Sequence, residues 1–177
     1  LDGVLYTPNA AGLVEAVDAA TGETIWRQEP PPEMAQERNS QSTRGVDHWE
    51  GDSQRRLFSN RNGYLYSLDL RTGEPFAGFG DNGRVSLTPA EARNFRWTSG
   101  PIVVGDVVVI AGNVDGAGDS GMRWKDSLSE DGRGFDALTG QLLWTFHAVP
   151  REGEYGADTW GDDSRAHSGD LGSWCCV

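Results

Sequence analysis

Few side chains of the kinds that commonly carry out chemistry occur in this chain, and they are scattered. Its two cysteines stand side by side as Cys175-Cys176, and its three histidines are His48, His147 and His167. Adjacent thiols can form a disulfide only by closing a strained ring, and two cysteines indicate little about the compartment in which a protein works. We interpret His147 and His167 as structural or surface residues, so none of these side chains defines a catalytic centre by itself.

A sequence motif that occurs three times indicates which structural elements must position any functional residue. Asp-x-x-Thr-Gly occurs at residues 18–22, 69–73 and 136–140, each time after an apolar or aromatic stretch. The aspartate can accept a hydrogen bond from the backbone N–H two residues on, and the glycine adopts a positive φ angle at little steric cost. The motif therefore predicts a hairpin turn. In two copies a tryptophan follows eight residues after the aspartate, and we expect Trp26 and Trp144 to lie in the core between adjacent units.

The segments around these turns have the composition of β-strands. β-Branched or aromatic residues dominate at 4–6, 57–59 and 107–110, and Asn62-Gly63 is a strong signal for a two-residue hairpin. The aspartates of successive motifs are 51 and 67 residues apart. This spacing is about the length of one four-stranded blade plus loops. The sequence therefore predicts an all-β fold, a partial β-propeller of about three antiparallel four-stranded blades, with the excess residues in loops at 29–42 and 112–131.

The composition agrees with such a domain and excludes some functions. The 177 residues include 24 glycines, which suits a turn-rich chain, and 37% hydrophobic residues. A net charge of −12 argues against nucleic acid as a partner, because nucleic-acid binding needs a basic surface. The sequence contains no run of about 18 apolar residues, so it predicts no transmembrane helix. We expect a single incomplete propeller domain over 1–177, with blade portions at approximately 1–30, 44–90 and 97–147 and a loop-rich tail at 148–177.

Several segments, in their order and spacing, resemble one known family. They are Val4-Leu5-Tyr6-Thr7-Pro8, the Arg-Gly-Val segment at 44–52, the stretch 63–69 followed by 79–83, and the stretch 134–147 followed by Pro150-Arg151 and Asp158-Thr159-Trp160. On these residues the chain is similar to the N-terminal side of the pyrroloquinoline quinone (PQQ)-dependent dehydrogenases, and nearer to their glucose- and sorbosone-type branch than to their methanol-type branch. The resemblance implies an eight-bladed propeller. Three units do not close a ring and would leave unpaired strand edges, so we expect the chain to be a fragment of a longer protein.

The resemblance implies three cofactor contacts in this chain. Arg44 matches an arginine that contacts the carboxylates of PQQ, Thr98 matches a threonine that hydrogen-bonds the cofactor, and Trp174 matches the tryptophan that forms the floor beneath the quinone ring. A guanidinium fork suits a planar, multiply carboxylated molecule, and a flat indole suits a flat tricyclic ring. The alternatives remain a surface arginine, an ordinary strand threonine and a tryptophan that packs between blades.

Two other features of the family are absent or displaced. Alcohol-oxidising members carry adjacent cysteines a few residues before the arginine, but residues 39–43 contain none, so the role of that pair is not transferred to Cys175-Cys176. In the glucose-type branch a histidine near the arginine approaches the cofactor. His48 is a weak candidate for it, because Trp49 occupies the matching position.

The resemblance also implies a metal ion beside the quinone, either calcium or a similar divalent ion. Calcium prefers about six to eight oxygen ligands, and Asn113 and Asp115 lie in roughly the matching loop. A solvated acidic loop explains these two residues equally well, so we assign no metal ligand. The family's aspartate base lies downstream of Trp174 and its metal-site glutamate lies upstream of Leu1, so we expect no catalytic residue in this segment and no turnover by it alone.

By resemblance, the expected function is the oxidation of a sugar or alcohol hydroxyl with hydride transfer to PQQ. The electrons would pass to a downstream quinone or cytochrome, and the location would be periplasmic, with any anchor to the inner membrane in missing segments. The alternative is a non-enzymatic propeller scaffold built from the same repeats. A scaffold shares the Asp-x-x-Thr-Gly motif but needs neither the Arg-Gly-Val segment nor the loop at 158–160. These two features therefore favour the enzyme.

Overall fold

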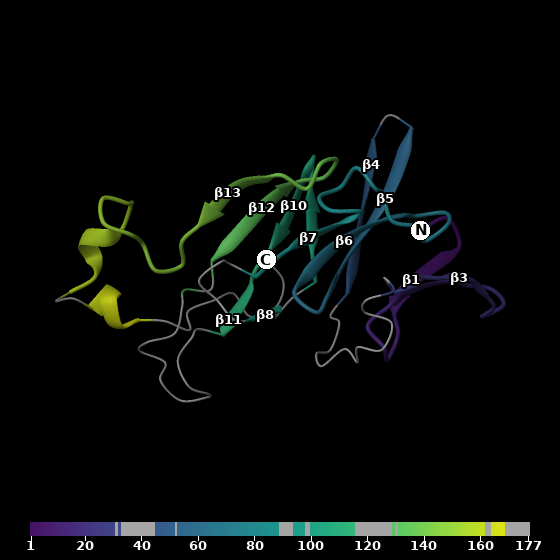
Figure 1. Ribbon diagram of the computed structural model, residues 1–177, viewed down its shortest axis with the longest axis horizontal. Helices are drawn as coiled ribbons and strands as arrows, with labels where there is room; N and C mark the ends of the chain where they lie inside the picture. Colours follow the sequence, from purple (N-terminus) through teal and green to yellow (C-terminus); the bar gives the residue numbers. More distant parts are fainter. Residues whose placement is uncertain are drawn as a thin grey trace.

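The protein is an all-β structure in which each pairing between named strands is antiparallel (Figure 1). The computed structural model describes residues 1–30, 32, 45–51, 53–88, 94–97, 100–115, 129, 131–161 and 164–168. The predicted fold class, with antiparallel four-stranded sheets, is confirmed. No helix among the described residues is long and apolar enough to cross a lipid bilayer.

The strands form three main sheets in chain order and one small sheet. The first sheet contains β1 (Val4–Pro8), β2 (Val14–Asp18) and β3 (Thr24–Arg27). The second contains β4 (Val46–Gly51), β5 (Gln54–Arg61), β6 (Tyr64–Asp69) and β7 (Arg84–Ser86). The third contains β9 (Ile102–Val104), β10 (Val107–Ile110), β12 (Gly132–Asp136) and β13 (Leu142–Phe146). The small sheet pairs β8 (Asn94–Trp97) with β11 (Gly112–Asp115), and two short 3-10 helices, η2 (Ala157–Thr159) and η3 (Ser164–His167), follow β13.

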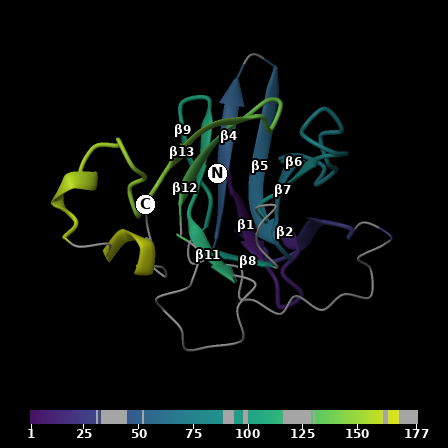
Figure 2. The ribbon, with the colours of Figure 1, turned by 60° about the vertical axis from the view of Figure 1, so that its left-hand side comes forward.

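Hydrophobic cores lie between consecutive main sheets. The two views in Figures 1 and 2 show the second sheet between the first and the third. The core between the first and second sheets contains Tyr6, Val14, Trp26, Leu57, Tyr66, Leu68 and Leu70. The core between the second and third sheets contains Trp49, Phe58, Leu65, Phe79, Leu87, Val108, Ile110, Phe135 and Ala137. Alternate residues of β5 and β6 therefore serve opposite cores, as a strand buried on both faces requires.

The three Asp-x-x-Thr-Gly turns share one set of hydrogen bonds. In the first turn, Asp18 Oδ1 accepts from the N–H groups of Ala20 and Thr21 at 2.9 and 2.8 Å, and the equivalent bonds form at the other two aspartates. The three glycines have φ angles of 78°, 76° and 75°. The predicted turn is confirmed. The structure adds a bond that the sequence did not indicate, because each threonine Oγ1 accepts from the N–H of the residue after the glycine, at 3.2 to 3.3 Å.

The predicted Asn62-Gly63 hairpin is also confirmed. The two residues have φ angles of 48° and 75°, and Arg61 at the end of β5 pairs with Tyr64 at the start of β6. Positive φ angles at both central residues define the turn that best matches the twist of the flanking strands. The turn therefore fixes the register of the two longest central strands.

Trp26 packs against the turn of the next unit, as predicted. Its indole N–H donates to the carbonyl oxygen of Leu70 at 3.2 Å. Its ring covers Gly73 so closely that a Cβ built there would meet the ring. Tyr6 lies beside the same indole, with ring centroids 5.9 Å apart. The first sheet is thus held to the second through an aromatic side chain and one turn.

Trp144 occupies the corresponding place in the third unit, but the prediction that it lies in the core is wrong. Its ring covers Gly134 of the neighbouring strand β12, yet 43% of the residue is exposed. β13 is an edge strand, and all of its residues are exposed. Within the described part of the chain, no turn of another unit covers this tryptophan. The burial of such a tryptophan depends on the neighbouring unit, which Trp26 has and Trp144 lacks here.

Part of the segment that we predicted to be a loop is a strand. Gly112–Asp115 forms β11 and pairs with Asn94–Trp97, in a register that sets Gly112 opposite Trp97. The sequence Gly-Asn-Val-Asp has a single β-branched residue, so its composition did not indicate a strand. Pairing with a strand 15 to 21 residues away in sequence, rather than local propensity, makes it one.

The aspartate turns predict a stability that depends on pH. Hydrogen bonds from the hydroxyl of Thr139, and then from backbone N–H groups, hold the pKa of Asp136 below its ordinary value of 3.8. A pKa that folding depresses adds stability above the ordinary value, and that stability is lost as pH falls through the folded-state pKa. Asp136→Asn keeps an acceptor but cannot titrate. We therefore expect wild type to exceed this variant in urea midpoint at about pH 5, and we expect this advantage to become smaller as the pH falls below 3.8; a gap that does not change with pH would contradict the assignment.

Candidate functional site

Described strands flank two of the predicted cofactor contacts in sequence: β4 follows Arg44, and β8 and β9 lie on either side of Thr98. Arg44 comes two residues before β4, and Thr98 comes between β8 and β9. Arg44, Thr98 and Trp174 lie outside the described residues, as does Cys175-Cys176. Their roles therefore stay predictions, and the structure reports on the strands that flank the first two.

Asp47 ties the beginnings of these two strands together. Its Oδ2 accepts from the backbone N–H of Val103, the second residue of β9, at 2.7 Å. Its Oδ1 accepts from the N–H of His48 at 2.8 Å. A carboxylate that accepts from two backbone N–H groups makes stronger bonds than a neutral acceptor does. The segments that follow Arg44 and Thr98 are therefore held side by side through one side chain.

Trp49 makes a second link between the same two sheets. It is 7% exposed, and its indole N–H donates to Asp106 Oδ1 at 2.9 Å. Asp106 lies in the turn between β9 and β10, and its own carbonyl oxygen accepts from the N–H of Ala137 at 2.9 Å. Asp47 and Asp106 thus fasten β4 to the third sheet at two successive points. This arrangement joins β4 firmly to the third sheet, and within the described part of the chain both carboxylates are used in it.

His48, the weak candidate for a cofactor contact, faces solvent. Its side chain is 43% exposed, and its Nδ1 lies 3.5 Å from Asp47 Oδ1. An exposed pair at this distance contributes little to stability. A contact from His48 to a cofactor stays a prediction.

The two residues considered for the metal site lie on β11. Asn113 and Asp115 pair with Arg96 and Asn94 of β8, the strand that leads toward Thr98. The topology therefore brings the backbone of the predicted metal loop beside the backbone that precedes a predicted cofactor contact. Among the described residues, no group of three or more His, Cys, Asp or Glu side chains is placed to hold a metal ion.

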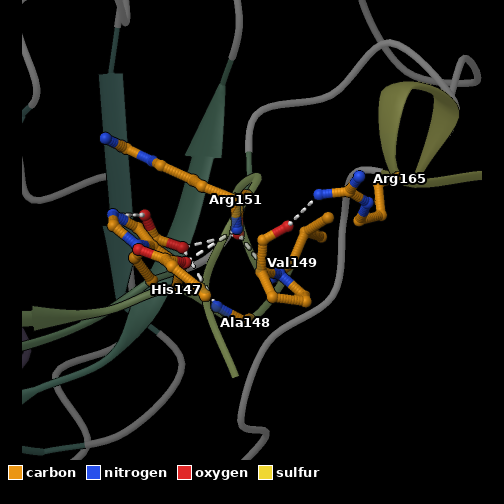
Figure 3. A network of polar contacts seen from close by, with 9 residues as sticks. His147, Ala148, Val149, Arg151 and Arg165 are labelled. Carbon is orange, nitrogen blue, oxygen red and sulfur yellow. Dashed lines mark hydrogen bonds and ion pairs between the residues drawn. The ribbon is translucent and has the colours of Figure 1, made fainter. Parts of the chain in front are cut away.

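A polar network that the sequence analysis did not find joins the flank of β12 to the segment after β13 (Figure 3). His147 Nδ1 lies 2.8 Å from Glu154 Oε1, and its Nε2 lies 3.8 Å from Asp131 Oδ2. Asp131 Oδ1 accepts from the hydroxyl of Ser129 at 2.5 Å and from the N–H of Ala148 at 3.2 Å. The side chain of His147 is 15% exposed. His147 is thus mostly buried and bonded within this network, which agrees with the interpretation of it as a structural or surface residue.

Glu154 closes the same segment on itself. Its Oε2 accepts from the N–H of Arg151 at 2.7 Å. This bond, with a smaller contribution from His147, holds the pKa of Glu154 below its ordinary value of 4.5. Arg165 of η3 reaches the carbonyl oxygen of Pro150 at 3.5 Å (Figure 3). The partners are spread over more than 30 residues without a period, so no local pattern in the sequence reveals them.

The comparisons with known sequences agree over the whole chain. A family model described as "PQQ: Glucose/ethanol/alcohol dehydrogenase, beta-propeller domain" matches residues 1–177. The chain is 34% identical over 152 residues to the quinohemoprotein alcohol dehydrogenase ADH IIB of Pseudomonas putida, a match that covers 84% of this chain and 19% of that protein. It is 30% identical over 173 residues to the quinoprotein glucose dehydrogenase A of Acinetobacter calcoaceticus, covering 78% of this chain and 20% of that protein. The chain thus spans about a fifth of the length of these relatives.

Solved structures show the same fold. The quinohemoprotein alcohol dehydrogenase ADHIIG of Pseudomonas putida HK5 matches with a TM-score of 0.70 and 24% identity, over 99% of this chain and 25% of that chain. The quinohemoprotein alcohol dehydrogenase of Comamonas testosteroni matches with a TM-score of 0.68 and 22% identity, over 99% of this chain and 26% of that chain. At these identities the likeness concerns the fold alone.

Proposed function

This chain belongs to the PQQ family of glucose/ethanol/alcohol dehydrogenase β-propeller domains, and on that premise we propose that it forms part of the cofactor-binding propeller of a dehydrogenase that oxidises a sugar or alcohol hydroxyl. The observation that carries the proposal is the match of the family model to residues 1–177. Because the curated relatives are about five times longer, we assign the complete activity to a longer protein that contains this segment.

The chemistry of the predicted donors supports PQQ as the cofactor. Arg44 offers a guanidinium fork for carboxylates, Thr98 offers a hydroxyl, and Trp174 offers a flat surface that stacks beneath a ring and excludes water. Asp47 supports this set, since it holds together the two strands that follow Arg44 and Thr98 in sequence. When bound, PQQ supplies the carbon that accepts hydride, and the protein supplies binding and orientation.

Calcium is proposed because of the family, and the described side chains do not contribute to that proposal. Calcium needs about six to eight oxygen ligands, and the described residues offer no cluster of carboxylates placed for a metal ion. These residues therefore do not fit a calcium site on their own, and no step is assigned to the metal. Asn113 and Asp115 stay unassigned.

The family match favours the enzyme over a non-enzymatic propeller scaffold. Sugar and alcohol substrates are proposed because the relatives are named alcohol and glucose dehydrogenases. A periplasmic location and a downstream quinone or cytochrome as electron acceptor belong to the same proposal.

Arg44 provides the direct test of the proposal. We expect the longer protein, loaded with PQQ and Ca²⁺, to oxidise a sugar or an alcohol in a dye-linked assay. Arg44→Ala should raise the Kd for PQQ about tenfold to a hundredfold, because a charge-assisted bidentate contact is lost. Arg44→Lys should give a Kd for PQQ between those of wild type and Arg44→Ala, since lysine keeps the charge without the planar guanidinium fork.

Arg27→Ala is the matched control for this test, because Arg27 is an exposed arginine of β3 that pairs with Glu15. It should leave the Kd for PQQ unchanged. Equal PQQ affinity in the Arg44→Ala and Arg27→Ala proteins would contradict the proposal. The 177-residue chain alone is expected to show no turnover with PQQ and Ca²⁺, and clear dye reduction by it would refute that expectation.

A further inference from the structure

A cleft of about 530 Å³ lies between the first two sheets. Its walls include Ser53, which lies in the turn between β4 and β5, and Asp69, at the end of β6. Asp47 and Val46, by contrast, lie at the opposite end of β4. Small-molecule sites have volumes of about 300–1,000 Å³. The cleft is thus large enough for a small ligand, and it lies at the end of β4 opposite to Val46 and Asp47.

One wall of the cleft is aromatic. Tyr6 and Trp26 both line it, with ring centroids 5.9 Å apart and ring planes inclined by 44°. Trp26 is fixed by its bond to Leu70, and Gly73 supports its ring. Both aromatic residues are half-buried, so they present part of their surface to the cleft. A rigid aromatic wall of this kind suits the C–H faces of a ring-shaped ligand.

The polar groups of the cleft are balanced in charge and not all satisfied. Arg55 pairs with Asp2 at 2.7 Å. Asp69 uses Oδ1 for the backbone of its own turn. The guanidinium of Arg71 and the hydroxyl of Tyr6 have no hydrogen-bond or ion-pair partner among the residues that the structure describes. The cleft therefore presents a cationic donor, a hydroxyl and a carboxylate oxygen that no other described residue occupies.

The hydroxyl of Tyr6 remains neutral at physiological pH. Burial raises its pKa above the ordinary value of 10.0, Arg55 opposes that effect, and Asp2 and Asp69 add to it. A neutral phenol both donates and accepts a hydrogen bond. Together with Arg71 as donor and Asp69 as acceptor, it offers a mixed set of bonds within one small volume.

From this arrangement we infer that the cleft binds a neutral polyhydroxylated molecule, a sugar or a sugar alcohol. Hydroxyl groups donate and accept at once, which matches the mixed set of free polar groups. An anion is disfavoured, because two carboxylates line the cleft beside two guanidinium groups and the chain carries a net charge of −12. The inference does not depend on PQQ, and it describes binding rather than a reaction.

The other two copies of the turn suggest a replacement for Arg71 that should still allow the protein to fold. Arg71 is the third residue of its Asp-x-x-Thr-Gly turn, where the first turn has Ala20 and the third has Leu138. Arg71→Ala therefore installs a residue that an identical turn already accepts. Leu138→Ala replaces the same position of the third turn, which does not line the cleft. Tyr6→Phe removes the hydroxyl while the ring remains.

D-glucose and D-gluconate, titrated into the chain without PQQ, test the inference. The NMR signal of the Trp26 indole N–H should shift saturably with glucose and less with gluconate. The Kd for glucose should rise about tenfold in Arg71→Ala and severalfold in Tyr6→Phe, and it should not change in Leu138→Ala. The inference is overturned if glucose produces no saturable shift at Trp26, if gluconate binds more tightly, or if Arg71→Ala and Leu138→Ala bind glucose alike.

Discussion

Replacing Arg56 with alanine is expected to lower the free energy of unfolding by about 3 kcal/mol. Arg56 is 5% exposed, and its Nη1 donates to the carbonyl oxygens of Ala137 and Leu138 at 3.1 and 2.8 Å, in the turn of the third unit. Its guanidinium lies 4.2 Å from the centre of the Phe76 ring. Alanine would leave a cavity and carbonyl oxygens without their donor, and a buried acceptor without a donor keeps its full desolvation penalty.

The arginine has a further partner on its own strand that makes its geometry specific. Gln54 Oε1 accepts from both Nε and Nη2, at 3.1 and 2.7 Å. Burial lowers the pKa of Arg56, and Asp136 opposes that effect, but a guanidinium stays charged at any pH used for folding studies. Arg56→Lys should therefore recover only part of the loss, because lysine keeps the charge and loses the planar fork.

Urea unfolding followed by tryptophan fluorescence measures these losses. Arg27→Ala removes an arginine whose side chain is 56% exposed, and it should change the midpoint far less. Equal midpoints for the Arg56→Ala and Arg27→Ala proteins would mean that Arg56 does not hold the second and third sheets together.

The local features of this fold were predictable because they depend on a few neighbouring residues. The turn at residues 18–22 and its two repeats follow from an aspartate that accepts from nearby N–H groups and a glycine at positive φ, and Asn62-Gly63 follows from the twist of paired strands. The family relationship was predictable too, because the order and spacing of many weak motifs together resemble one family, and the family model matches the chain. The all-β class followed from these signals together.

The features that failed or were missed depend on residues far away in the sequence. Trp26 and Trp144 have the same local pattern, yet only Trp26 has a neighbouring turn against its ring among the described residues. The bonds of Asp47 to β9 and of His147 to two carboxylates join segments whose separation has no periodic signature. The contacts proposed for Arg44 and Thr98 came from resemblance alone and stay predictions.

Replacing Gly73 with alanine is expected to cost about 3 kcal/mol, whereas the same replacement at Gly22 should cost about 1 kcal/mol. The two glycines end identical turns and have φ angles of 76° and 78°, so the backbone penalty of the added Cβ is the same at both. At Gly22 no atom lies within 4 Å of that Cβ, whereas at Gly73 it would lie 2.4 Å from a ring carbon of Trp26. Trp26 must move, and it then loses its bond to Leu70.

The difference between these two variants measures how strongly Trp26 holds the first sheet to the second. Urea unfolding gives both free energies, and Trp26→Phe tests the cause. A smaller ring can give way at lower cost, so Gly73→Ala should destabilise the Trp26→Phe protein less than it destabilises wild type, while Gly22→Ala should destabilise both equally. If Gly73→Ala and Gly22→Ala cost the same in wild type, the indole does not press on this turn in solution. If they differ but Trp26→Phe leaves the difference intact, the strain at Gly73 comes from a neighbour other than Trp26.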